Sequence, residues 1–135
     1  MNAPVPVVRM IVLDDHDRVL ILRRQHSEHG SGQWCLPGGK VDYGDTVLET
    51  VAKELKEETS LACEGARYLF FQDSLPPEPG KMHCINFYYE VETSGELALN
   101  AESDGFAWIH ANDLPRYDIA FRNDEALLRY WKNKD

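Results

Sequence analysis

Residues 38–61 constrain this chain more than any other stretch, because a glycine-rich turn leads there into one strongly patterned segment. An apolar stripe at helical spacing is formed by Val47, Leu48, Val51, Ala52 and Leu55. The pattern predicts a helix over residues 45–59. Asp45 suits the start of this helix, since its carboxylate can accept hydrogen bonds from the free backbone N–H groups there.

Three glutamates accompany the apolar stripe. Glu54, Glu57 and Glu58 stand at i, i+3 and i+4, so their carboxylates share one face of the predicted helix. Like charges at these spacings cost a few tenths of a kcal/mol per pair, and a solvated helix would more often intersperse lysines. Converging carboxylates suit a hard divalent cation, which takes oxygen ligands. The alternative is a solvated helix face.

The same stretch resembles the signature of the Nudix hydrolases, G-x5-E-x7-R-E-U-x-E-E-x-G-U, in which U is a bulky aliphatic residue. The spacing holds without a gap. The matching positions are Gly39, Glu54, Leu55, Glu57, Glu58 and Leu61. The departures are Asp45 for the first glutamate, Lys53 for the arginine and Ser60 for the second glycine. The preceding residues, 32–39, are also similar to the family's usual lead-in.

The resemblance implies a single Nudix domain over residues 1–135 with an α/β (α+β) fold. In that fold an αβα sandwich encloses a mixed β-sheet, and the signature forms a loop–helix–loop. The order of elements along the chain agrees, since several strands, a helix, more strands and a final helix suit a mixed sheet with helices packed on it.

The resemblance also implies a chemistry, the hydrolysis of a nucleoside diphosphate linked to another moiety X. Water would attack phosphorus with the help of Mg²⁺, or of Mn²⁺ as a substitute. The implied metal ligands are the Gly38 carbonyl and the carboxylates of Glu54, Glu57 and Glu58. Lys53 would orient these acids, and Gly39 would let the substrate approach the backbone closely. A further acid, as ligand or base, would be Glu102 or Asp104.

The departures bear on precision rather than on the metal ligands. Lys53 keeps the charge of the family arginine but replaces its fork of donors by a point contact. Glu49, four residues earlier, can pair with Lys53 on the helix. Ser60 stands where the helix should end in a left-handed residue, which costs a non-glycine residue on the order of 1 kcal/mol. We therefore expect the box acids to be positioned less precisely, without loss of activity.

The rest of the chain reads as short strands and one closing helix. Residues 5–13 and 18–24 flank an acidic turn and predict a β-hairpin. That turn, residues 14–17, is better explained by acids bonding to nearby backbone than by a metal cluster. Further strands are predicted at residues 64–74, 82–92, 96–99 and 105–110, a proline-rich loop at 76–80, and a helix at 123–132.

Candidate substrate contacts lie outside the signature. Arg23 and Arg24 could reach a phosphate, but only one of them should face the site because strand side chains alternate. Residues 25–33 suggest a loop over the substrate entrance. A zinc pair formed there by His26 and His29 is the weaker interpretation. Trp34 could stack on a base, although core packing is the better explanation.

Charge and cysteine content limit the partners. The net charge of −9 argues against a nucleic-acid polymer as partner, so a small nucleotide or nucleoside diphosphate derivative is expected. Cys35, Cys63 and Cys84 are odd in number and far apart, which favours reduced thiols in a cytoplasmic protein. No signal peptide or membrane-spanning run is visible. A monomer or homodimer is expected.

Two classes of function remain open. One is the Mg²⁺-dependent pyrophosphohydrolase, and the other is a non-catalytic Nudix-like module that only binds nucleotides. Retention of Glu54, Glu57 and Glu58 favours the enzyme. Isopentenyl diphosphate isomerase shares the fold, but nothing in 135 residues supports its additional elements.

Overall fold

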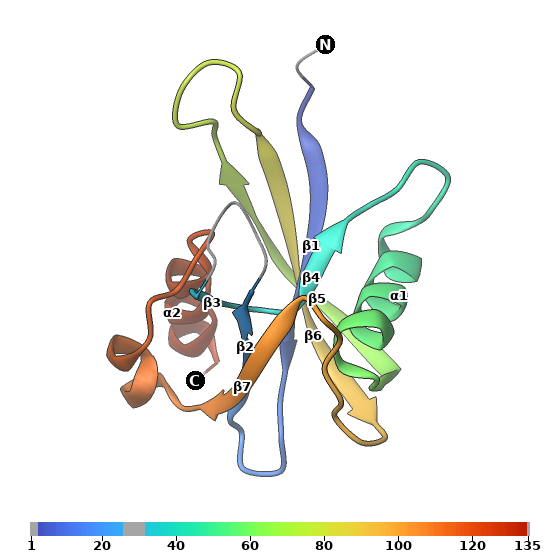
Figure 1. Cartoon of the computed structure of the whole chain (residues 1–135), viewed down its shortest axis with the longest axis vertical. Coiled ribbons are helices and arrows are strands. Elements are labelled where there is room, and N and C mark those ends of the chain that lie inside the picture. The colour runs from blue at the N-terminus through green and yellow to red at the C-terminus, as the bar shows by residue number, and fades with distance from the viewer. Residues whose placement is uncertain (1–2, 26–31, 135) are drawn as a thin grey trace.

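The computed structural model describes residues 3–25 and 32–134. In chain order its elements are β1 (Val5–Val12), β2 (Val19–Arg24), β3 (Trp34–Cys35), β4 (Gly38–Lys40), α1 (Val47–Thr59), β5 (Ala62–Ser74), β6 (Cys84–Ser94), β7 (Ser103–Ile109), the short 3₁₀ helix η1 (Ala111–Arg116) and α2 (Asn123–Asn133). Figure 1 shows α1 and α2 on opposite sides of the strands. The predicted αβα sandwich is therefore confirmed.

The strands divide between two sheets. The larger has the order β4-β1-β6-β5 and is mixed, because β1 runs parallel to β6 and antiparallel to β4. The smaller has the order β3-β2-β7 and is antiparallel. Side chains of β1 alternate between the two sides, so Val8 and Met10 pack toward α1 while Ile11 packs toward α2.

The predicted hairpin between the first two strands is wrong. β1 and β2 lie in different sheets, and only the isolated bridge between Leu13 and Val19 joins them. The turn itself forms as expected, since Asp14 Oδ1 accepts from the backbone N–H groups of His16 and Arg18 at 2.9 Å. β1 cannot pair with β2 along its length because β4 and β6 already occupy both of its edges.

Helix α1 begins later than predicted and buries a different face. Its N-cap is Thr46 rather than Asp45, and Glu49 completes a capping box with Thr46. Of the predicted apolar stripe, Val51 and Leu55 are buried, whereas Ala52 is exposed and Leu48 is 57% exposed. The helix ends as predicted, with Ser60 in the left-handed region at φ 66°.

Other predictions fare unevenly. Residues 96–99 form no strand, although the Ala98 N–H donates to the Thr59 carbonyl oxygen and so ties this loop to the end of α1. The closing helix appears as α2, with Ala126, Leu127 and Tyr130 buried as expected. All three cysteines are free thiols. Among the described residues, no helix has the length and apolar character needed to cross a bilayer.

Candidate active site

The acidic face of α1 packs against the glycine pair that opens β4. The Gly38 N–H donates to Glu58 Oε2 at 3.2 Å, and Glu58 is only 9% exposed. A Cβ on Gly39 would lie 2.6 Å from the Glu54 carboxyl carbon, and one on Gly38 would lie 2.1 Å from the Val8 carbonyl oxygen. Glycine is required at both positions because backbone and carboxylates approach too closely for any side chain.

The two inner glutamates share one electrostatic environment. Burial raises the pKa of Glu58 to about 8, and the charges of Glu54 and Glu102 act in the same direction. The pKa of Glu54 is also raised, mainly by burial and then by the charge of Glu57. Arg9 and the Gly38 N–H oppose the shift at Glu58. Without a cation, this face therefore keeps a proton at neutral pH.

The donor set fits a hard divalent cation in type. Carboxylate and carbonyl oxygens are the ligands that Mg²⁺ and Mn²⁺ prefer. The positive charges near Glu54 and Glu58 do not outweigh burial and the neighbouring acids, since the pKa values of both glutamates are raised. As the side chains stand in residues 3–25 and 32–134, no three histidine, cysteine or acidic groups are gathered closely enough to hold a metal ion. Glu57 lies exposed beside the inner pair, so the third carboxylate must turn inward to complete a site.

The candidate acids before β7 differ in their surroundings. Asp104 forms an ion pair with Arg23 at 2.6 Å, on the partly exposed surface of the smaller sheet. Glu102 acts electrostatically on both Glu54 and Glu58, so it lies within reach of the inner pair. The charge of Glu102 therefore acts on the glutamate face, whereas Asp104 is engaged with Arg23.

Comparison with known proteins decides the family. The Nudix domain profile matches residues 3–130. The chain belongs to the Nudix family. It is 29% identical to an ADP-ribose pyrophosphatase of Methanocaldococcus jannaschii over 90% of this chain and 72% of that protein. It is 34% identical to the 8-oxo-dGDP phosphatase of Mus musculus over 84% of this chain, which spans 33% of that longer protein.

Solved structures agree with the sequence relatives. The crystal structure of a MutT Nudix hydrolase from Burkholderia pseudomallei superposes with a TM-score of 0.82 at 28% identity, covering 93% of this chain and 97% of that one. A MutT protein from Methanosarcina mazei superposes with a TM-score of 0.84 at 22% identity, covering 99% and 98% of the two chains, and supports the fold alone. The protein is thus a Nudix hydrolase.

The lysine in the Nudix box makes different contacts from those expected. Lys53 Nζ donates to Asp42 Oδ2 at 2.8 Å and to Asp45 Oδ2 at 3.1 Å. The predicted pair with Glu49 is wrong, because Glu49 is engaged in the capping box with Thr46. Lys53 therefore holds the loop before α1 against the helix, and its charge partly opposes the rise in the pKa of the neighbouring Glu54.

The two arginines at the end of β2 make different contacts. Arg23 pairs with Asp104, whereas the Arg24 guanidinium lies 4.7 Å from the centre of the Phe121 ring. Trp34 is half-buried, and its ring packs edge-on against that of Tyr117 with 5.0 Å between the ring centres, which agrees with core packing. His26 and His29 lie outside the described residues.

Sequence reasoning missed Arg9 on the central strand β1. Its Nη1 donates to the Leu36 carbonyl oxygen at 3.3 Å, and its guanidinium lies 4.8 Å from the centre of the same Phe121 ring. A signal was available, because Arg9 is the one charged residue in an otherwise apolar strand. A charge at such a position is costly unless it is partnered or used.

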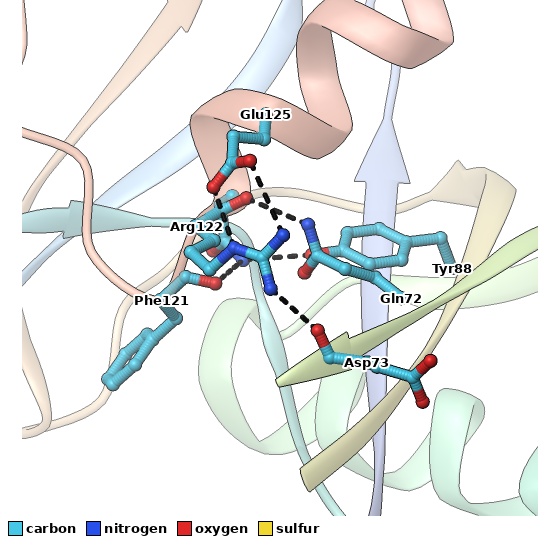
Figure 2. A network of polar contacts seen from close by, with 7 residues as sticks. Gln72, Asp73, Tyr88, Phe121, Arg122 and Glu125 are labelled. Carbon is cyan, nitrogen blue, oxygen red and sulfur yellow. Dashed lines mark hydrogen bonds and ion pairs between the residues drawn. The ribbon is translucent and has the colours of Figure 1, made fainter. Parts of the chain in front are cut away.

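The turn that carries Phe121 is held by a polar network, drawn in Figure 2. Phe121 and Arg122 both adopt left-handed backbone conformations, at φ 59° and 57°. Arg122 donates to the Asp73 carbonyl oxygen at 2.6 Å and to the carboxylate of Glu125. These bonds offset the strain. The pair with Glu125 is local, at i,i+3, whereas the bond to the Asp73 carbonyl oxygen spans 49 residues and has no local sequence signal.

Buried groups continue the same network inward. Asn123 Nδ2 donates to the Tyr88 hydroxyl at 3.1 Å, and that hydroxyl donates to Gln72 Oε1. Asn123 Oδ1 accepts from the Leu36 N–H at 2.9 Å. Leu36 directly precedes the Pro37-Gly38 lead-in, so the start of α2 is connected through Asn123 to the Nudix loop.

Proposed function

We propose that this protein is a Mg²⁺-dependent pyrophosphohydrolase of a nucleoside diphosphate derivative, in which water attacks phosphorus. The observation that carries the proposal is the packing of Glu54 and Glu58 against Gly38 and Gly39. The names of the relatives support the substrate class, since ADP-ribose and 8-oxo-dGDP both contain a nucleoside diphosphate. Mn²⁺ is expected to substitute for Mg²⁺.

Glu54, Glu57, Glu58 and the Gly38 carbonyl would hold the metal. When bound, Mg²⁺ would neutralise the diphosphate and lower the pKa of the attacking water. Glu58 must release its proton for this, and Glu57 must turn from the exposed surface. The two glycines leave the β4 backbone open to the phosphates, while Lys53 holds the loop before α1 in place.

Glu102 is the proposed general base. Its charge reaches both inner glutamates, and its backbone N–H is fixed by Asn100 Oδ1 at 3.0 Å. Arg24 and Arg9 supply positive charge beside the site in a chain whose net charge is −9. A polyanionic substrate needs such local cations to approach an acidic protein.

The test is a panel of nucleoside diphosphate derivatives assayed for phosphate-containing products, with Mg²⁺ and with excess chelator. We expect turnover with Mg²⁺ and none with chelator. For substitutions of the box glutamates, Glu96→Gln is a matched control, because Glu96 is an exposed acid remote in sequence from the Nudix box. Binding of the nucleotides without any turnover would reject the enzyme and leave the binding module.

A further inference from the structure

The short turn that carries Glu102 is closed from within by Asn100. Asn100 Oδ1 accepts from the Glu102 N–H at 3.0 Å, and the Asn100 carbonyl oxygen accepts from the Ser103 N–H at 3.4 Å. An asparagine side chain that binds the backbone two residues further on is a common way to fix a turn. These bonds set the shape of the turn but not its place in the fold, because all their partners belong to the turn itself.

Two hydrogen bonds from Gln25 fix the same turn from outside. The Gln25 N–H donates to the Glu102 carbonyl oxygen at 3.0 Å, and Gln25 Nε2 donates to the Ala101 carbonyl oxygen at 2.9 Å. These two carbonyl groups belong to the peptide groups on either side of the Glu102 Cα. Gln25, which is 76 residues from Ala101, therefore holds the backbone from which the Glu102 side chain projects.

The regular pairing of β2 with β7 stops at this point. Arg23 pairs with Gly105 and Arg24 with Ser103, so Asp104 is an extra residue on β7. Bulges of this kind re-aim side chains and are frequent beside active sites. Since β2 ends at Arg24, the side-chain bond of Gln25 extends the connection between the two segments past the last ladder pair.

The segment before the turn is tied to the helix that carries the box glutamates. The Ala98 N–H donates to the Thr59 carbonyl oxygen at 2.9 Å, and Ser60 Oγ donates to the Ala98 carbonyl oxygen at 3.0 Å. Figure 1 shows this segment running from β6 past the end of α1 into β7. Glu102 thus lies between two anchors, the end of α1 and the end of β2, which agrees with the action of its charge on the inner glutamates.

We propose that Gln25 is a positioning residue for the hydrolysis, which holds the backbone on both sides of Glu102 so that the carboxylate can take a proton from the attacking water. As the water oxygen bonds to phosphorus and the phosphoanhydride bond breaks, this proton passes to Glu102. The inference rests on the proposed function, in which Glu102 is the base. Glu102 is exposed, so little besides its backbone fixes its carboxylate, and a displacement of about 1 Å can cost on the order of a hundredfold in rate.

Gln25→Met tests the side-chain bond. Methionine has nearly the length and shape of glutamine but no N–H donor, and the backbone bond to Glu102 remains. With the substrate that the nucleotide panel identifies, we expect kcat to fall about tenfold while KM stays at the parental value, because Gln25 acts on the base and not on the bound substrate. A parental kcat would overturn the proposal.

A double-mutant cycle separates this role from a general loss of stability. Glu102→Gln alone should lower kcat on the order of a hundredfold or more, as expected for loss of a general base. Adding Gln25→Met to Glu102→Gln should cause no further fall, because there is no base left to position. If the two effects multiply, Gln25 acts independently of Glu102 and the proposal is rejected.

Gln72→Met is the matched control. Gln72 is also a partly buried glutamine whose Nε2 donates to a backbone carbonyl oxygen, that of Arg122 at 3.2 Å. Its substitution should lower the melting temperature, since Gln72 also accepts from the Tyr88 hydroxyl, but it should leave kcat unchanged. An equal fall of kcat in Gln72→Met would show that loss of stability alone reduces turnover and would overturn the role of Gln25.

Hydrogen exchange at the Glu102 amide, read by NMR, follows the turn without any substrate. We expect exchange to be several-fold faster in Gln25→Met than in the parent, and unchanged in Gln72→Met, because the turn opens more often without its outer bond. Equal exchange in Gln25→Met and the parent would overturn the proposal.

The failures of the two proposals differ. A parent that hydrolyses nothing, or a Glu102→Gln variant with parental turnover, would reject the proposed function or its base, and this inference with it. A fall of kcat in Glu102→Gln but not in Gln25→Met would reject this inference alone.

Discussion

The glutamate face of α1 and the network around Arg122 are both dense in polar groups, yet they are built in opposite ways. The first brings like charges together, and burial leaves Glu58 with a pKa of about 8. The second satisfies its members with one another across β5, β6 and the start of α2. The comparison indicates that the glutamate face needs a ligand to balance its charge, whereas the Arg122 network connects its strands and helix through hydrogen bonds among its own members.

The largest effect should come from Glu58→Gln. We expect turnover to fall by orders of magnitude, because an amide cannot supply the negative charge that holds the cation. The fold should survive, since glutamine keeps the shape and can still accept from the Gly38 N–H. Initial rates with saturating Mg²⁺ measure the effect, with Glu96→Gln as the control. Near-parental rates would mean that Glu58 is structural.

The second prediction concerns pH without metal. The pKa of Glu58 is raised from 4.5 to about 8 by burial, so the folded protein keeps a proton that the unfolded chain releases between these values. The free energy of unfolding should therefore fall as pH rises from about 5 to 8. Urea unfolding in chelator measures it, and Glu58→Gln should have a flatter profile. Parallel profiles for parent and variant would contradict the assigned pKa.

Glu57 should couple stability to the cation. Without metal, Glu57→Gln removes the negative charge of one of three crowded carboxylates, and the variant should match or exceed the parent in stability by a few tenths of a kcal/mol. With Mg²⁺ at a hundredfold excess over Kd, the parent should gain about 2.7 kcal/mol and the variant much less. Paired melting curves with and without Mg²⁺ test this. Equal gains would show that Glu57 is not a ligand.

The Arg122 network should respond in stability rather than in metal binding. Tyr88→Phe removes a buried hydroxyl that accepts from Asn123 and donates to Gln72, and it leaves polar atoms of both partners without that bond. The expected cost is about 1–3 kcal/mol. Urea unfolding measures it, and the gain from Mg²⁺ should remain that of the parent. A smaller gain from Mg²⁺ would show that the two regions are not independent.

The two regions also differ in how far the sequence predicted them. The Nudix box lies within one stretch of chain, so its resemblance to the family signature implied that Gly38, Gly39, Glu54 and Glu58 lie together. Its helix start was mistaken although Thr46 and Glu49 have the spacing of a capping box. The exposure of Leu48 could not be foreseen, because the strands packed against α1 decide which of its faces is buried.

The other region joins segments that are far apart in the chain. Asn123 is 87 residues from Leu36 and 35 from Tyr88, and Arg122 is 49 from Asp73. No local spacing marks such contacts. The failed hairpin has the same origin, since β4 and β6, both distant in sequence from the turn at Asp14, occupy the edges of β1. The one local indication of a long-range contact was the charge of Arg9 within an otherwise apolar strand.

The smallest expected effect tests the end of the box helix. Ser60 has φ 66°, a region in which a non-glycine residue is strained by about 1 kcal/mol. Ser60→Gly removes that strain but also the bond from Ser60 Oγ to the Ala98 carbonyl oxygen at 3.0 Å, an exposed interaction worth about 0.5–1 kcal/mol. The two contributions nearly cancel, so the melting temperature should change little. Ser60→Ala loses the bond and keeps the strain, and should therefore melt below both Ser60→Gly and the parent. If Ser60→Ala melts with the parent, the serine contributes no bond, and the family glycine is absent here without compensation.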